Sequence, residues 1–118
     1  MKTTSEGIAS VQGFFSLGKP LGIKKNGLDF GVVFCESQCN AAAVYTQNKV
    51  KGASLYVTQE HLKNGRAKAI AVISGNANVG TGKKGVQDAE EACKLIAEEL
   101  GISSRDVVIA ATGVIGKM

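Results

Sequence analysis

The feature that most constrains the fold is a run of apolar residues at helical spacing between residues 86 and 100. These residues recur every three or four positions and are Val86, Ala89, Cys93, Ile96, Ala97 and Leu100. On an α-helix they form one apolar stripe, and four glutamates cover the other side. Gly101 follows, and glycine commonly ends a helix. The sequence therefore predicts a helix over 86–100 whose stripe packs on another layer.

The rest of the chain reads mostly as short strands. Patterning predicts strands at 7–15, 19–23, 28–35, 40–46, 54–57, 67–74 and 107–111. The dipeptide Asn26-Gly27 favours a hairpin turn between the second and third of them. Thr58 is a candidate N-cap for a short helix that Gly65 closes, and 75–85 is expected to be a loop. No linker or repeat divides the chain, so we expect one α/β layered domain over residues 1–118.

Composition narrows the class of protein. The chain has 118 residues with a net charge of +4, and its cations are dispersed, which argues against nucleic-acid binding. No segment is long and apolar enough to span a membrane, and the polar first ten residues do not resemble a secretory signal, so a cytoplasmic location is expected. The thiols of Cys35, Cys39 and Cys93 are expected to be reduced and mostly structural. With His61 as the single histidine, no metal site is expected.

A glycine-rich segment at residues 80–85 matches the G-x-G-x-x-G pattern of dinucleotide-binding loops. It follows a predicted strand and precedes the predicted helix, where backbone N–H groups can hold a phosphate. Two features disagree with that interpretation. The connection from the strand is long, and the acidic residue expected about twenty positions later, Asp106, begins a strand instead of ending one. A turn that needs positive φ angles explains the glycines equally, and both interpretations stay open.

A second segment, Ala111-Thr112-Gly113-Val114-Ile115-Gly116, follows a predicted buried strand. Glycine lets the backbone turn and lets another group approach closely. Such a turn can aim backbone N–H groups at a developing oxyanion, and the hydroxyl of Thr112 can add a donor. An ordinary turn at the end of a strand explains the same residues. Spacing alone favours the ordinary turn.

A nucleophile with an adjacent base is not evident from local spacing. His61 lies in a polar segment without a neighbouring carboxylate, serine or cysteine, and is expected to be a surface residue. Cys93 belongs to the apolar stripe and is expected in the core. Lys49 and Lys51 flank Val50 on a polar turn and are expected to be solvated. The chain is therefore predicted to carry no nucleophile of its own.

Four stretches, taken in order, resemble the ornithine acetyltransferase family, the bifunctional glutamate N-acetyltransferases of arginine biosynthesis. They are Gly22-Ile23-Lys24-Lys25 with Asp29-Phe30-Gly31-Val32-Val33, Ala41-Ala42-Ala43-Val44-Tyr45-Thr46-Gln47-Asn48-Lys49-Val50, Ser74-Gly75-Asn76-Ala77-Asn78 with Thr81-Gly82, and Ala111-Thr112-Gly113-Val114-Ile115-Gly116. The resemblance implies a layered α/β sandwich of the DmpA/ArgJ-like type, here a partial domain. It also makes 80–85 part of a family loop and not a dinucleotide site.

The resemblance further implies a chemistry and its partners. In the family a precursor cleaves itself before an internal threonine, which becomes the N-terminal nucleophile of a β chain. That threonine takes an acetyl group from N-acetylornithine and passes it to glutamate, and bifunctional members also accept acetyl-CoA. Thr112 and Gly113 would form the oxyanion hole, and the assembly expected is an α2β2 heterotetramer without a cofactor.

This sequence departs from the family pattern because it reaches Met118 without a cleavage site. We therefore expect the N-terminal part of an α chain, inactive alone and inclined to self-associate. Two alternatives remain at this point. One is a nucleotide-dependent protein that uses residues 80–85, and the other is a non-catalytic binding module.

Overall fold

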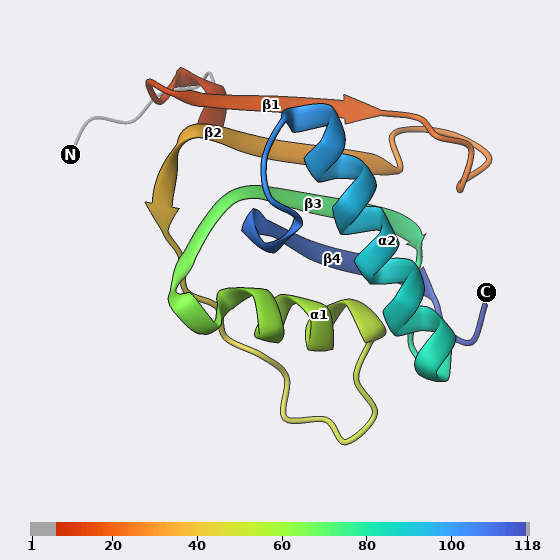
Figure 1. Cartoon of the computed structure of the whole chain (residues 1–118). Helices are drawn as coiled ribbons and strands as arrows, with labels where there is room; N and C mark the ends of the chain where they lie inside the picture. The colour runs from red at the N-terminus through yellow and green to blue at the C-terminus, as the bar shows by residue number, and fades with distance from the viewer. Residues whose placement is uncertain (1–6, 118) are drawn as a thin grey trace.

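The computed structural model describes residues 7–117, so residues 1–6 of the polar start and Met118 lie outside the described residues. Four strands form one sheet in the order β1-β2-β3-β4 (Figure 1). The strands are β1 (Phe14–Lys19), β2 (Phe30–Asn40), β3 (Arg66–Asn76) and β4 (Val107–Val114). The first three pair antiparallel, whereas β3 and β4 are parallel. The expected α/β class is confirmed.

Of the two helices, the first lies along the outer edge of β4 and the second crosses one face of the sheet (Figure 1). They are α1 (Ala53–His61) and α2 (Gly82–Leu100), and three short 3-10 turns, Ile8–Ser10, Leu62–Asn64 and Ser104–Asp106, complete the described elements. The helix α2 connects the parallel pair β3 and β4. None of the helices within residues 7–117 is long and apolar enough to cross a membrane.

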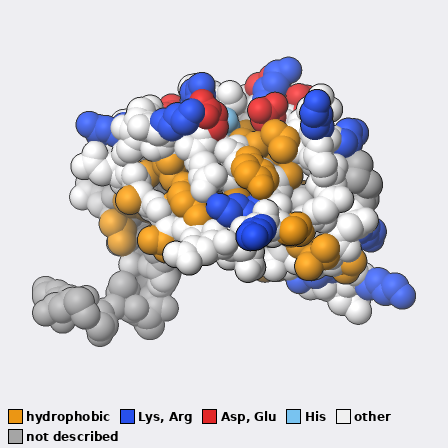
Figure 2. Space-filling model, turned by 90° about the horizontal axis from the view of Figure 1, so that it is seen from below, with side chains coloured by type: hydrophobic (Ala, Val, Ile, Leu, Met, Phe, Trp, Pro, Cys, Tyr) orange, Lys and Arg blue, Asp and Glu red, His pale blue; other side chains and the backbone are white. Residues whose placement is uncertain are grey.

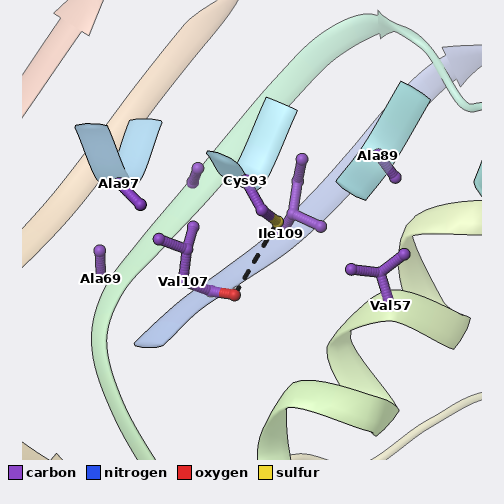
Figure 3. Close-up of a cluster of buried hydrophobic side chains, with 8 residues drawn as sticks. Val57, Ala69, Ala89, Cys93, Ala97, Val107 and Ile109 are labelled. Atoms are coloured by element: carbon purple, nitrogen blue, oxygen red, sulfur yellow. Dashed lines mark hydrogen bonds between the residues drawn. The ribbon is translucent and has the colours of Figure 1, made fainter. Parts of the chain in front are cut away.

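The core lies between the sheet and the helices (Figure 3). Alternate strand residues point toward the helices, because successive side chains of a strand face opposite sides. The buried members are Val57, Ala69, Ala71, Ala89, Cys93, Ala97, Val107 and Ile109. The three core residues that α2 contributes, Ala89, Cys93 and Ala97, all belong to the predicted apolar stripe. The stripe is confirmed, with the helix starting four residues earlier than expected.

The opposite face of the sheet is apolar and is not covered by α1 or α2. We call it the open face and define it by Ile70 and Val72 of β3 and Ala110 and Thr112 of β4. Ile70 is 48% exposed and Val72 41% exposed. Burying such side chains is favourable by roughly 1.5–3 kcal/mol each, so this face suits a packing partner.

Several predicted strands are wrong. Residues 7–15 contain a 3-10 turn, with β1 starting only at Phe14. Residues 19–23 are mostly loop, so the hairpin pairs β1 with β2 and the Asn26-Gly27 turn lies in a longer connection. Residues 40–46 are irregular beyond Asn40, and β2 extends to that residue past a register shift after Phe34. These errors share one cause, because short apolar runs do not distinguish a strand from a loop that packs on neighbours.

The predicted strand at 54–57 is instead part of α1, and Thr58 is inside that helix and not its N-cap. The helix begins after Gly52. Its first two backbone N–H groups are satisfied from a distance, because Ala53 N–H donates to the Asn78 carbonyl at 3.0 Å and Ser54 N–H donates to Asn78 Oδ1 at 3.3 Å. The Ser54 hydroxyl donates to the same Oδ1, also at 3.3 Å. A cap from 24 residues away leaves no local signal in the sequence. Gly65 does end the following turn, in the left-handed conformation at φ 67°.

Candidate active site: the end of the parallel strand pair

Thr112 and Gly113 lie inside β4, which continues to Val114 instead of ending at Ala111 as predicted. Thr112 pairs with Ser74 and Gly113 pairs with Gly75 on β3. The segment is thus the carboxyl end of two parallel strands and not a turn. The Thr112 side chain is exposed and belongs to the open face, on the side away from the helices.

Gly113 could not be replaced by a larger residue without displacing backbone. Its φ is +128°, a region that side chains with a Cβ rarely adopt. A Cβ built there would lie 2.7 Å from both Gly75 Cα and Asn76 N. The close approach that the sequence suggested for this glycine therefore occurs, and its partner is the backbone of β3.

The outer edge of β4 is partly occupied by side chains of α1. The Thr58 hydroxyl donates to the Ile109 carbonyl at 2.7 Å and accepts from the Ile109 N–H at 3.1 Å. His61 Nδ1 lies 2.8 Å from the Val107 carbonyl, and because a carbonyl only accepts, this nitrogen carries the proton. His61 is half-buried, so sequence reasoning that placed it on the surface missed its contact with β4.

These contacts fix which backbone groups of β4 face away from β3. In a parallel strand the residues alternate, each directing both its N–H and its C=O to the same side. Ile109 directs both groups to the outer edge, so by alternation the N–H of Gly113 points to that edge as well. Val114, one residue further on, directs its carbonyl to the opposite side, toward β3, as the alternation requires. There the carbonyl accepts from the Ala77 N–H at 3.0 Å. Within residues 7–117, no α1 side chain makes a hydrogen bond to β4 beyond Ile109.

The glycines at 80–85 have a structural explanation. The helix α2 begins at Gly82 with Thr81 as its N-cap, and the Thr81 hydroxyl donates to the Asn78 carbonyl at 2.9 Å. Gly85 is buried at the crossing of α2 with α1, where a Cβ would lie 3.1 Å from that of Ala53. Asp106, the acidic residue about twenty positions beyond the motif that did not fit the dinucleotide pattern, accepts from Gln38 at 2.8 Å. These contacts favour the structural interpretation of the motif.

Two hollows adjoin the start of α2. One of ~380 Å³ is lined by Asn76, Asn78 and Asp88 among others, and one of ~410 Å³ by Lys49, Lys51 and Lys83. Neither is lined by Thr112 or Gly113. On the face that Figure 2 shows, Lys and Arg side chains are scattered among apolar and polar ones.

The cysteines are unpaired and buried to different degrees. Cys35 and Cys93 are buried and Cys39 is half-buried. Burial, with a smaller contribution from the charge of Glu90, raises the pKa of the Cys93 thiol to about 11. A protonated thiol is a poor nucleophile, so the predicted structural role of Cys93 is consistent with its environment. In residues 7–117 no group of three or more potential ligands gathers around a metal position.

Comparison with known proteins decides the family. The family model described as "ArgJ family" matches residues 16–118. The chain belongs to the ArgJ family. The arginine biosynthesis bifunctional protein ArgJ of Bacillus cereus is 42% identical over 116 residues, which is 98% of this chain and 28% of that protein. The protein of the same name from Caldanaerobacter subterraneus is 43% identical over 105 residues, covering 89% and 26%.

Solved ArgJ structures share the fold. The arginine biosynthesis bifunctional protein from Bacillus halodurans superposes with a TM-score of 0.91 at 41% identity, covering 94% of this chain and 59% of that one. The ornithine acetyltransferase of Mycobacterium tuberculosis, solved in complex with ornithine, gives 0.85 at 35% identity, covering 90% and 58%. The resemblance read from the sequence is confirmed. The chain spans about a quarter of the length of the two bacterial relatives named first.

Proposed function

We propose that this chain is part of the α chain of an acetyltransferase that moves an acetyl group from N-acetylornithine to glutamate. In this proposal Thr112 and Gly113 form the oxyanion hole. The observation that carries it is the pair of donors at the end of β4. The Gly113 N–H points to the outer edge of the strand, beyond the reach of α1, and the neighbouring Thr112 hydroxyl is exposed.

The chemistry assigned to these donors is stabilisation of a tetrahedral intermediate. The threonine nucleophile of a β chain attacks the acetyl carbonyl carbon, and the carbonyl π electrons move to oxygen. The Thr112 hydroxyl and the Gly113 N–H donate hydrogen bonds to that oxyanion. Collapse re-forms the carbonyl and breaks the C–N bond. The departing nitrogen takes up the proton that the threonine hydroxyl lost on attack, so ornithine leaves and the acetyl group stays on threonine. The glutamate amine then attacks the acetyl-threonine carbonyl, and its proton passes to the threonine oxygen as the C–O bond breaks and the free enzyme is released.

A rigid position for the donors is essential to this role, and the backbone contacts of Gly113 supply it. A donor that is already oriented stabilises the transition state without the cost of reorganising during the reaction. Gly113 is held by ladder pairing to Gly75 and by contact with the Asn76 backbone. No cofactor or metal is needed for this chemistry, and acetyl-CoA would serve as a substrate if the enzyme is bifunctional.

The partner in this proposal is the β chain of the same precursor, in an α2β2 assembly. The open face supports it, because Ile70 and Val72 expose much of their apolar surface in the described part of the chain. A β chain would also bring the nucleophile that local reasoning could not find here. The chain alone is therefore expected to transfer no acetyl group, and the assembly is expected in the cytoplasm.

The test replaces the matching segment of the Bacillus cereus ArgJ protein with residues 16–118 of this chain. The grafted enzyme should transfer acetyl from N-acetylornithine to glutamate, measured by release of ornithine, while the isolated chain should not. The unmodified Bacillus cereus protein is the reference for activity. Transfer by the isolated chain would contradict the need for a β chain, and a correctly folded graft without transfer would contradict the proposed function.

A further inference from the structure

Asp29 is a buried carboxylate that holds a loop in place. The residue is 1% exposed and directly precedes β2. Its Oδ1 accepts from the Leu21 N–H at 2.6 Å, and its Oδ2 accepts from the N–H groups of Ile23 at 2.7 Å and Lys24 at 3.0 Å. These backbone hydrogen bonds favour the ionised form and lower the pKa of Asp29.

The backbone of the same residue is bound to the sheet on two sides. The Asp29 carbonyl accepts from the Ser74 N–H at 2.8 Å, and the Asp29 N–H donates to the Lys19 carbonyl at 3.3 Å. The loop over residues 21–24 is therefore tied, through a single residue, to the end of β3. Ser74 pairs with Thr112 on the neighbouring strand β4, so the hydrogen bond between Asp29 and Ser74 lies next to the candidate oxyanion hole.

The loop that Asp29 holds packs directly on Gly75. A Cβ on Gly75 would lie 2.8 Å from Ile23 Cγ2 and 3.0 Å from Lys24 Cγ, so only a glycine lets the loop approach so closely. Gly75 in turn contacts the backbone of Gly113. The loop, Gly75 and Gly113 thus form a continuous series of close contacts. A shift of the loop removes the support on one side of Gly75.

We propose that Asp29 is a positioning residue for the acetyl transfer, which sets the Gly113 N–H by clamping the loop over Gly75. This inference rests on the proposed function of Thr112 and Gly113. Asp29 itself does not touch the reacting atoms. Its role is to keep the backbone of β3, and through it the donor on β4, within the small range of positions that an oxyanion hole tolerates.

The informative substitution is Asp29→Asn, which keeps the size of the side chain. An amide offers one acceptor oxygen and two N–H donors, so at one position a donor would face a backbone donor. The loop must then shift or leave a buried N–H without a partner. The matched control is Asp106→Asn, because the Asp106 carboxylate is also a hydrogen-bond acceptor, for the Gln38 side chain, but lies before β4 and away from its carboxyl end.

The experiment measures kcat and KM of the grafted enzyme, with active sites counted by the burst of ornithine released on acetyl-enzyme formation. Asp29→Asn should lower kcat per active site by roughly 10–100-fold with KM within a factor of about two, whereas Asp106→Asn should leave both unchanged. A residue with only a structural role would reduce the number of active sites and the melting temperature but not kcat per site.

A second measurement needs only the 118-residue chain. In amide NMR spectra, Asp29→Asn should shift the Gly113 resonance and Asp106→Asn should not. An unmoved Gly113 resonance, or an unchanged kcat per site, would overturn the positioning role. If Thr112→Val lowers kcat while Asp29→Asn does not, the proposed function stands and this inference fails. If neither substitution lowers kcat, both fail.

Discussion

The hydroxyl of Thr58 is the contact whose removal tests the packing of α1 on β4 most sharply. It lies in a buried side chain and binds both polar groups of Ile109, at 2.7 Å to the carbonyl and 3.1 Å from the N–H. Thr58→Val keeps the shape and removes only the hydroxyl. Both backbone groups of Ile109 then lose their partner in a buried site, because that residue is 3% exposed.

The expected cost follows from those two groups. A buried donor or acceptor left without a partner costs about 1–3 kcal/mol. Since one hydroxyl serves both, we expect Thr58→Val to lower the free energy of unfolding by about 2–4 kcal/mol. Thr58→Ser is the matched control, because it keeps the hydroxyl and loses one methyl group, a cost of about 0.8 kcal/mol.

Urea unfolding of the purified chain, followed by circular dichroism, measures the difference. With a urea dependence of about 2 kcal/mol per M, the valine variant should unfold at a midpoint roughly 1–2 M lower than the wild type. The serine variant should shift by less than about half of that. Equal midpoints for the two variants would show that the hydroxyl does not stabilise the edge of β4, and the reasoning would be refuted.

Three further outcomes follow from single contacts. Gly113→Ala should abolish most folded protein, whereas Gly116→Ala, which also has a positive φ of 75° but open space around it, should cost only about 1–2 kcal/mol, as urea unfolding would reveal. With its pKa at about 11, Cys93 should react with iodoacetamide at pH 8 at least ~100-fold more slowly in the folded chain than in urea, and equal rates by mass spectrometry would contradict its burial. Because the folded-state pKa of Asp29 is lowered, its stabilising contribution is present above the unfolded value of about 3.9 and is lost as the pH falls through the folded value. The wild type should therefore lose stability on acidification more steeply than Asp29→Asn, and parallel pH curves would exclude that contribution.

The elements predicted correctly are those whose signal is local. The helix α2 carries its own apolar stripe and ends at Gly101, which adopts φ 66° as a helix-ending glycine does. The buried strand at 67–74 lies within β3, because a run of small and branched apolar residues suits a strand covered by helices. In both cases the apolar residues that favour the helix or the strand are also the residues that pack against the other layer.

The elements predicted wrongly depend on partners distant in the sequence. The apolar residues of α1 do not form a stripe, and two of its buried residues are Ser54 and Thr58, whose hydroxyls bind Asn78 and Ile109. The extension of β4 through Gly113 was read as a turn, because the sequence cannot show that Gly75 lies opposite it. The candidate site residues Thr112 and Gly113 are assigned through the family resemblance and stay a prediction, whereas Asp29 stands out only once its hydrogen bonds are known.

The proposed oxyanion hole is tested most directly by the kinetics of Thr112 variants in the grafted enzyme. Thr112→Val removes the hydroxyl donor and keeps the branched shape, and Thr112→Ser keeps the donor. Loss of one such donor typically raises the barrier by about 2.7–4 kcal/mol, which corresponds to a kcat lower by about 10²–10³-fold. We predict that loss for the valine variant, with KM nearly unchanged and the serine variant close to wild type. A valine variant with wild-type kcat, or one altered only in KM, would contradict the assignment of Thr112 to the oxyanion hole.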